Sequence, residues 1–266
     1  MLQSHGSRLD AGAKASDAAL IRDYPAGAML LLGVSIAGWL FLAWLALDMG
    51  SPLGMLVMPM SRDWSAANVF AIGAMWSVMM VAMMLPSALP MIFTFVQLAR
   101  RNGEHARAHG FVAAYVLVWV VFGALGTVAQ WSLHRLDALD AMALKASPAV
   151  TVALLVAAGL YQFSPLKHVC LASCRSPFAF LIGEWRPGAR GAFRMGLLHG
   201  LLCLGCCWAL MALLFVGGVM NVPWVAALAV AVAIEKLAPR GERIANLLGA
   251  GLIVAAAARW LIVTAA

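Results

Sequence analysis

The stretch AFRMGLLHGLLCLGCCWALMALLFVG, residues 192–217, decides the fold. From Met195 to Gly217 it contains no Asp, Glu, Lys or Arg. An apolar run longer than about 18 residues is typical of a helix that crosses a lipid bilayer. The stretch therefore predicts a membrane-spanning helix, although it also contains an imidazole and three thiols, which such a helix does not need for contact with lipid.

The rest of the chain has the same character. Of its 266 residues, 64% are hydrophobic and only 11% are charged, a balance that excludes a soluble domain. We predict an all-α fold, a polytopic transmembrane helical bundle of about seven spans. A cytoplasmic tail, residues 1–26, precedes a single transmembrane domain, residues 27–266. The predicted spans are residues 27–47, 66–98, 111–132, 148–163, 192–217, 222–237 and 244–263.

Basic residues predict the orientation of these spans. With the N-terminus inside, fourteen Lys and Arg residues, from Arg8 to Arg243, fall on the inner side. Only Arg62, Arg135, Lys145 and Arg259 fall on the outer side. This bias predicts a cytoplasmic N-terminus and an external C-terminus. The net charge of +7 is therefore a topology signal and does not indicate nucleic-acid binding.

The fifth span contains the first candidate site. His199, Cys203 and Cys207 are four residues apart, so they share one face of a helix, with Cys206 beside them. Imidazole and thiolate suit Cu(I) or Zn(II), and Met195 and Met211 extend the stripe with thioethers. The alternative is that these cysteines are small packing residues. Gly196 and Gly200 have the G-x-x-x-G spacing that allows another helix to approach closely.

The second span contains the second candidate, MWSVMMVAMMLPSALPM, residues 75–91. Met79 and Met83 lie on one stripe of the predicted helix, and Met80 and Met84 on the adjacent stripe. Thioethers select soft ions such as Cu(I), but methionine is also a common packing residue in helix interfaces. Pro86 and Pro90 should kink this helix and free backbone carbonyls within the membrane.

The third candidate follows the fourth span, where Cys170 and Cys174 are one helical turn apart. The topology places them at the cytoplasmic edge, where they could capture or release a metal. Incidental cysteines in a short interfacial helix are the alternative. Glu235 and Lys236, near the end of the sixth span, have three alternative interpretations: a plain helix-end pair, a partner for an arginine, or a group for protons or metal.

These motifs, YQFSPLKHVCLASCRSP and a later Glu-Lys pair included, resemble an uncharacterised bacterial family of predicted metal-binding integral membrane proteins. The resemblance covers most of residues 66–240. It implies a multi-pass protein of the bacterial cytoplasmic membrane that binds a metal, with an unidentified activity. The positions here that match the family motifs include Met79, Met80, Met83, Met84, Cys170, Cys174, Cys206, Cys207, Met211, Glu235 and Lys236.

The leading hypothesis is a membrane protein that binds Cu(I), with zinc as a second choice, for transport, trafficking or cofactor delivery. Its expected partners are the lipid bilayer, the metal ion and a metallochaperone or another membrane protein. The candidate metal ligands are His199, Cys203, Cys206, Cys207, Cys170, Cys174, Met79, Met80, Met83, Met84 and Met211. Two alternatives remain open. One is a thiol–disulfide relay, which would be an enzyme, and the other is a structural subunit without metal.

Overall fold

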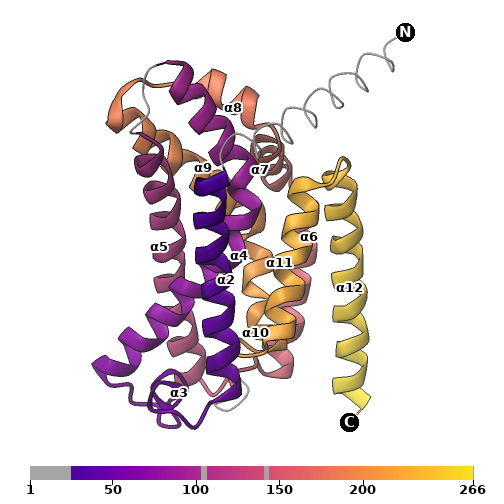
Figure 1. Ribbon diagram of the computed structural model, residues 1–266. Coiled ribbons are helices and arrows are strands. Elements are labelled where there is room, and N and C mark those ends of the chain that lie inside the picture. Colours follow the sequence, from indigo (N-terminus) through magenta and orange to yellow (C-terminus); the bar gives the residue numbers. More distant parts are fainter. Residues whose placement is uncertain (1–24, 103–106, 141–143, 266) are drawn as a thin grey trace.

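The structure, a computed structural model, describes residues 25–102, 107–140 and 144–265 (Figure 1). In these ranges every element is a helix apart from one isolated bridge between Leu139 and Ala146. The predicted all-α class is therefore confirmed, while the predicted tail lies almost wholly outside the described residues. The helices are α2 (Pro25–Leu47), α3 (Pro52–Val57), α4 (Ala66–Arg101), α5 (Ala108–Arg135), α6 (Pro148–Gln162), α7 (Pro165–Arg175), α8 (Pro177–Glu184), α9 (Gly188–Ala212), α10 (Leu214–Gly217), α11 (Val222–Leu237) and α12 (Gly241–Ala265).

Helices run along the molecule in alternating directions. In Figure 1, α2, α5, α9 and α12 descend from the end where α8 lies, and α4, α6 and α11 return to it. The most extensive packing joins α5 to both α4 and α9, and α12 to α6. The seven predicted spans thus correspond to helices, and the described chain begins and finishes at opposite ends of the bundle.

The number of spans differs from the predicted seven. Five helices, α2, α4, α5, α9 with α10, and α12, are long and apolar enough to cross a membrane, and no membrane is present in the structure. The pair α6 and α7 makes a sixth if it is one span bent by 65°. The sequence range 222–237 forms α11, a helix of 16 residues, about 24 Å long against a hydrocarbon layer of about 30 Å. Seven spans are therefore not confirmed.

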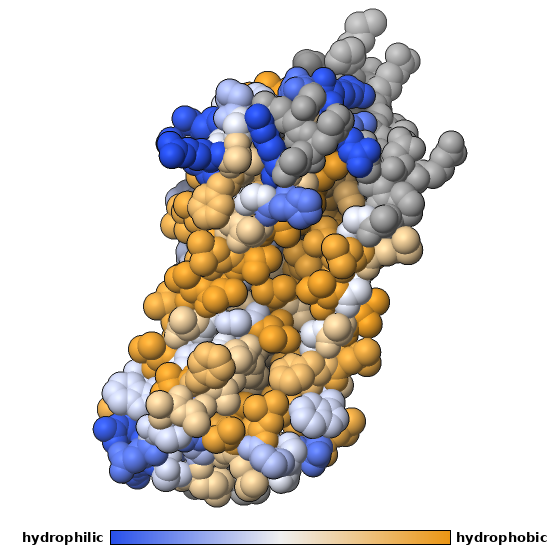
Figure 2. All heavy atoms as spheres, turned by 60° about the vertical axis from the view of Figure 1, so that its left-hand side comes forward, coloured by the Kyte–Doolittle hydropathy of each residue, from blue (hydrophilic) through white to orange (hydrophobic). Residues whose placement is uncertain are grey.

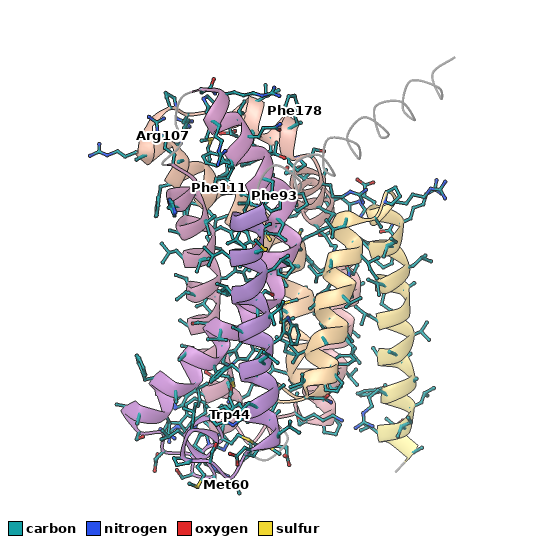
Figure 3. The ribbon with its side chains drawn as sticks, viewed as in Figure 1. Trp44, Met60, Phe93, Arg107, Phe111 and Phe178 are labelled. Atoms are coloured by element: carbon teal, nitrogen blue, oxygen red, sulfur yellow. The ribbon has the colours of Figure 1, made fainter. Side chains whose placement is uncertain are left out.

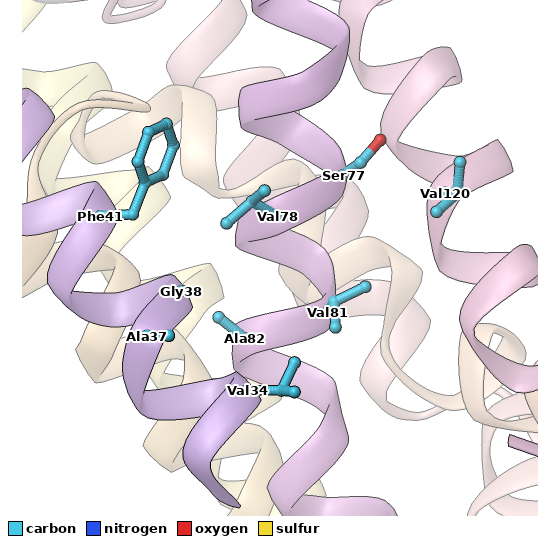
Figure 4. Close-up of a pocket in the computed structure, with 9 residues that line it drawn as sticks. All are labelled: Val34, Ala37, Gly38, Phe41, Ser77, Val78, Val81, Ala82 and Val120. Atoms are coloured by element: carbon cyan, nitrogen blue, oxygen red, sulfur yellow. The ribbon is translucent and has the colours of Figure 1, made fainter. Parts of the chain in front are cut away.

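The outer surface is apolar over the middle of the bundle and polar at its two ends (Figure 2). Figure 2 shows hydrophobic residues over the middle of one face and hydrophilic residues gathered at the two ends. Among the most exposed large apolar side chains are Leu30, Phe70, Leu247 and Val254. Such a band would be unstable against water and is compatible with lipid contact. An apolar groove between α2, α4 and α5, lined by Val34, Phe41 and Val81 among others, belongs to this band (Figure 4).

Helices α5 and α9 pack closely because α9 has glycine residues where the two helices meet. A Cβ atom added at Gly196 would lie 2.2 Å from the carbonyl oxygen of Phe111, and one at Gly200 would lie 2.8 Å from Val118. Only glycine allows the two backbones to approach this closely, as the G-x-x-x-G spacing predicted. The consequence for function is that Tyr115, which lies between Phe111 and Val118 on α5, faces the cysteine-bearing part of α9.

The two prolines do not break α4, which continues through Pro86 and Pro90. Because Pro86 has no N–H group, the carbonyl of Ala82 loses its helical donor. The buried hydroxyl of Ser35 on α2 donates to that carbonyl at 2.7 Å. The freed polar group therefore joins α2 to α4 two residues before Met84.

Candidate metal centre

Three cysteines on α9 form the base of the site. Cys203, Cys206 and Cys207 are at most 2% exposed, and all three are free thiols. The thiols of Cys206 and Cys207 donate hydrogen bonds to the carbonyl oxygen of Cys203, at 3.1 and 3.0 Å. The three side chains therefore lie on one buried side of α9, as their spacing predicted.

Met84 on α4 faces these cysteines from across the bundle. Its Sδ atom lies 4.0 Å from the Sγ atom of Cys207, and the side chain is completely buried. This contact joins the second candidate of the sequence to the first. We call Met84, Cys174, Cys203, Cys206 and Cys207 the thiol–thioether cluster.

Cys174 reaches the cluster from the bent pair of helices α6 and α7. Ser164 accepts a hydrogen bond from the N–H group of Lys167, and Pro165 follows it, so a new helix begins at a 65° bend. The bend turns α7 towards α9, against which it packs, and the Cys174 thiol interacts with those of Cys203 and Cys206. The sequence placed this cysteine in a separate site at the cytoplasmic edge, because it could not foresee the direction of the bend.

Cys170 lies one turn before Cys174 and packs against the backbone of α9. A Cβ atom added at Gly205 would lie 2.7 Å from the Cys170 Sγ atom. The hydroxyl of Tyr161 donates to the carbonyl oxygen of Gly205 beside it. Gly205 therefore provides the space that α7 needs to approach the cysteines of α9.

Lys236 is the principal residue that the sequence analysis did not place in the site. Its Nζ atom lies 2.9 Å from the Cys203 Sγ atom, 3.3 Å from the Ser87 Oγ atom and 3.9 Å from the Met84 Sδ atom. Lys236 is 6% exposed, so it does not extend to the membrane surface. A cation within an apolar span is costly without partners, and this was the signal in the sequence for a functional role.

Tyr115 on α5 completes this part of the site. Its hydroxyl lies 3.2 Å from the Cys203 Sγ atom and donates to the carbonyl oxygen of Met84 at 3.1 Å. One side chain thus holds a ligand candidate on α9 and the backbone of another on α4. No motif in the sequence indicated Tyr115, because it is a single aromatic residue within an apolar span.

Glu235 has a partner other than its neighbour Lys236. Its carboxylate accepts a hydrogen bond from Lys167 Nζ at 2.7 Å and from Gln162 Nε2 at 3.0 Å. Glu235 and Lys167 are each 1% exposed, so this is a buried ion pair between α11 and α7. The helix-end pair with Lys236 and the pairing of the carboxylate with an arginine are both wrong. Lys167 and Lys236, counted as inner topology charges, are buried instead.

His199 lies in an aromatic environment one turn before Cys203. Its ring stacks on those of Tyr115 and Phe111, with centroids 5.5 and 6.0 Å away, and Phe180 lies 5.8 Å away. Figure 3 shows Phe111 towards the end where Phe178 lies, far from Trp44 and Met60. Neither ring nitrogen has a hydrogen-bond partner among the described residues, although His199 is 2% exposed. Both nitrogens therefore remain available to a ligand.

The four other candidate methionines are buried in the bundle. Met79, Met80, Met83 and Met211 are each at most 3% exposed. Met79 faces a small gap near Trp39 and Val225, on the side of α2 and α11. The structure thus brings one predicted methionine, Met84, to the cysteines.

The donors form a sparse site. Across residues 25–102, 107–140 and 144–265, no three His, Cys, Asp or Glu side chains are arranged to hold a metal ion. The converging pairs of sulfur atoms combine thiols with a thioether, the donor types that favour Cu(I). A tetrahedral zinc site would need four protein donors or three with water.

Comparison with known proteins agrees with this chemistry. No curated protein and no solved structure matches the chain. A family model described as PpoB2, copper chaperone, matches residues 73–259, well over half of the chain. The matched range includes every cysteine, Met84 and Lys236. The chain therefore belongs to the PpoB2 copper chaperone family.

Proposed function

We propose that this protein is a multi-pass membrane protein that binds Cu(I) at the thiol–thioether cluster and delivers it to another protein. The observation that carries the proposal is the convergence of three buried sulfur side chains from two helices: Met84 Sδ lies 4.0 Å from Cys207 Sγ and shares the ammonium group of Lys236 with Cys203 Sγ. The copper chaperone family supports the choice of ion. In this proposal copper is the cargo.

The donor set favours Cu(I) over zinc. Soft thiolate and thioether ligands select Cu(I), whereas zinc prefers a closed tetrahedral set of thiolate, imidazole and carboxylate ligands. In the described residues no three His, Cys, Asp or Glu side chains are grouped, so the proposal rests on two thiols and one thioether. We assign Cys203, Cys207 and Met84 as the main ligands, with Cys206 as a neighbouring donor.

The remaining candidates form the route to and from this site. Cys174 contacts Cys203 and Cys206, so it can accept an ion from either thiol, and Cys170 lies one turn farther along α7. His199 and Met195 extend along α9 on the other side of Cys203. Met79, Met80, Met83 and Met211 would act as weak thioether donors along the bundle. The receiving partner is a copper-binding protein, soluble or embedded in the membrane.

The membrane assignment rests on the long apolar helices and the apolar band between polar ends. We propose seven crossings, in which α6 and α11 are short spans supported by their neighbours. The basic residues support a cytoplasmic N-terminus. A bacterial cytoplasmic membrane is the location implied by the resemblance of the sequence motifs.

A thiol–disulfide relay is the second candidate, and one observation favours it. The Cys174 thiol interacts with those of Cys203 and Cys206, and all five cysteines are free, which is the arrangement that a relay between α7 and α9 would use. Its oxidant or reductant would be a partner of the same thiol chemistry. This candidate predicts oxidation without stoichiometric metal, which distinguishes it from the copper site.

Both candidates are tested by anaerobic purification in detergent, supply of Cu(I), and measurement of copper and free thiols per chain. We expect about one copper per chain in the wild type, lost in Cys203→Ser and Cys207→Ser variants that elute as folded protein. Cys170→Ser removes a buried thiol of the proposed route that is not a ligand of the bound ion, so this matched control should retain copper. If the wild type binds no copper and contains a reversible disulfide, the copper proposal is wrong and the relay replaces it.

A further inference from the structure

Lys236 is the buried cation nearest to the proposed copper ligands. Helices α4, α5 and α9 surround its ammonium group with Met84, Ser87, Tyr115 and Cys203. The adjacent carboxylate of Glu235 is directed to Lys167 and Gln162 instead. The groups that face Lys236 in the described chain are therefore neutral donors and thiols, so its positive charge has a counter-charge only when a thiol ionises.

We infer that Lys236 determines ion selectivity by making the site electrically neutral with a monovalent soft cation. This inference rests on the proposed function. Two thiolates that bind Cu(I) carry one net negative charge, which the ammonium of Lys236 cancels. The same two thiolates with a divalent ion are already neutral, so Lys236 would leave one uncompensated positive charge. In an apolar interior that charge is costly.

The position of Lys236 fits this role. Its Nζ atom lies 2.9 Å from Cys203 Sγ and 3.9 Å from Met84 Sδ, so it occupies the point to which two proposed ligands direct their lone pairs. A monovalent ion of equal charge replaces it there, while Ser87 Oγ, 3.3 Å away, remains a partner for the displaced ammonium. Each thiol that binds the ion releases its proton to solvent, and no atom changes oxidation state.

The decisive variant is Lys236→Leu, which removes the charge without adding an atom that binds metal. Affinities for Cu(I) and Cd(II) would be measured in detergent by anaerobic competition with chelators, with Cd(II) as the divalent soft probe. We expect the variant to bind Cu(I) at least about tenfold more weakly and Cd(II) at least about tenfold more tightly, because a neighbouring charge acts strongly in an interior of low dielectric constant. Lys236→Arg should retain the wild-type preference.

Lys145→Leu is the control, since it removes a charge from an exposed position outside the cluster. It should leave both affinities unchanged. If the wild type binds Cu(I) but Lys236→Leu keeps the wild-type ratio of the two affinities, the inference is wrong and the copper site stands. If the wild type binds neither ion, the proposed function itself fails. Should Lys236→Leu fail to fold, a Lys236→Arg variant that binds Cd(II) better than Cu(I) would overturn the inference.

Discussion

Met84 provides the sharpest test of the site at the scale of a single residue. Replacing it by leucine removes the thioether that lies 4.0 Å from Cys207 Sγ but keeps nearly the same volume. We expect Met84→Leu to lower Cu(I) affinity about tenfold, while the free energy of unfolding changes by less than about 1.5 kcal/mol. Met75→Leu, an equally buried position on α4, is the control and should keep full affinity. Chelator competition and thermal melting supply the two measurements.

His199 makes a second prediction at this scale. Its two unpartnered nitrogens are buried among Phe111, Tyr115 and Phe180. An unsatisfied buried polar group costs about 1–3 kcal/mol, so His199→Phe should raise the melting temperature of the metal-free protein. If the imidazole assists copper binding, the same variant gains less stability from added Cu(I) than the wild type. A fall in the metal-free melting temperature of both His199→Phe and His199→Leu would contradict the first expectation.

The sequence predicted the candidate metal donors more completely than the residues that contact those donors. The cysteines of α9 were recognised because helical spacing alone places them on one face. Lys236 and Tyr115 were not recognised as members, because their contacts with Cys203 join residues 33 and 88 positions apart. Contacts over such separations depend on how helices pack, and no local pattern records them.

At the scale of helices, the packing of α5 against α9 can be tested by comparing Gly196 of α9 with Gly251, an exposed glycine of α12. A Cβ atom at Gly196 would meet the backbone of Phe111, whereas one at Gly251 would meet nothing within 4 Å. Gly196→Ala should therefore force α5 away from α9 and destabilise the protein substantially. Gly251→Ala should stabilise α12 by about 0.5–1 kcal/mol, because alanine loses less entropy in a helix. Equal melting temperatures for the two variants would show that α5 and α9 do not pack as described.

The buried pair of Glu235 and Lys167 tests the contact between α11 and the bent helix α7. Removing one partner leaves an uncompensated buried charge, so Glu235→Gln or Lys167→Met should each cost about 3–5 kcal/mol. The double variant should recover much of that loss, since no lone charge remains. Unfolding measurements on the double-mutant cycle check this, and additive losses would argue against the pair. Glu235 and Lys236 are consecutive on α11, so loss of the Glu235–Lys167 contact should also disturb the position of Lys236 beside Cys203. Each single variant should therefore also weaken copper binding.

The short helices show where sequence reasoning reached its limit for the fold. The ranges 148–163 and 222–237 were correctly located as helices, because their apolar runs are continuous. The sequence also indicated that Pro86 would free a carbonyl, but Ser35, its donor, lies 47 residues before Ala82. Nor did the pattern at Ser164 and Pro165 give the 65° angle at which α7 departs. Local signals thus located helix ends, while tertiary packing determined directions.

At the scale of the whole molecule, the alternating helices make a prediction about topology. The described chain begins and finishes at opposite ends of the bundle, so an odd number of crossings follows if α6 and α11 each span the bilayer. Basic residues favour the cytoplasm for the end that bears Arg100, Arg190 and Arg243. A reporter joined to the C-terminus should therefore be active only on the external side. Reporters in the loop after α5, residues 136–147, should agree with it, and one after α7 should give the opposite result. A cytoplasmic C-terminus would mean an even number of crossings, and would leave α6 with α7, or α11, as a re-entrant segment.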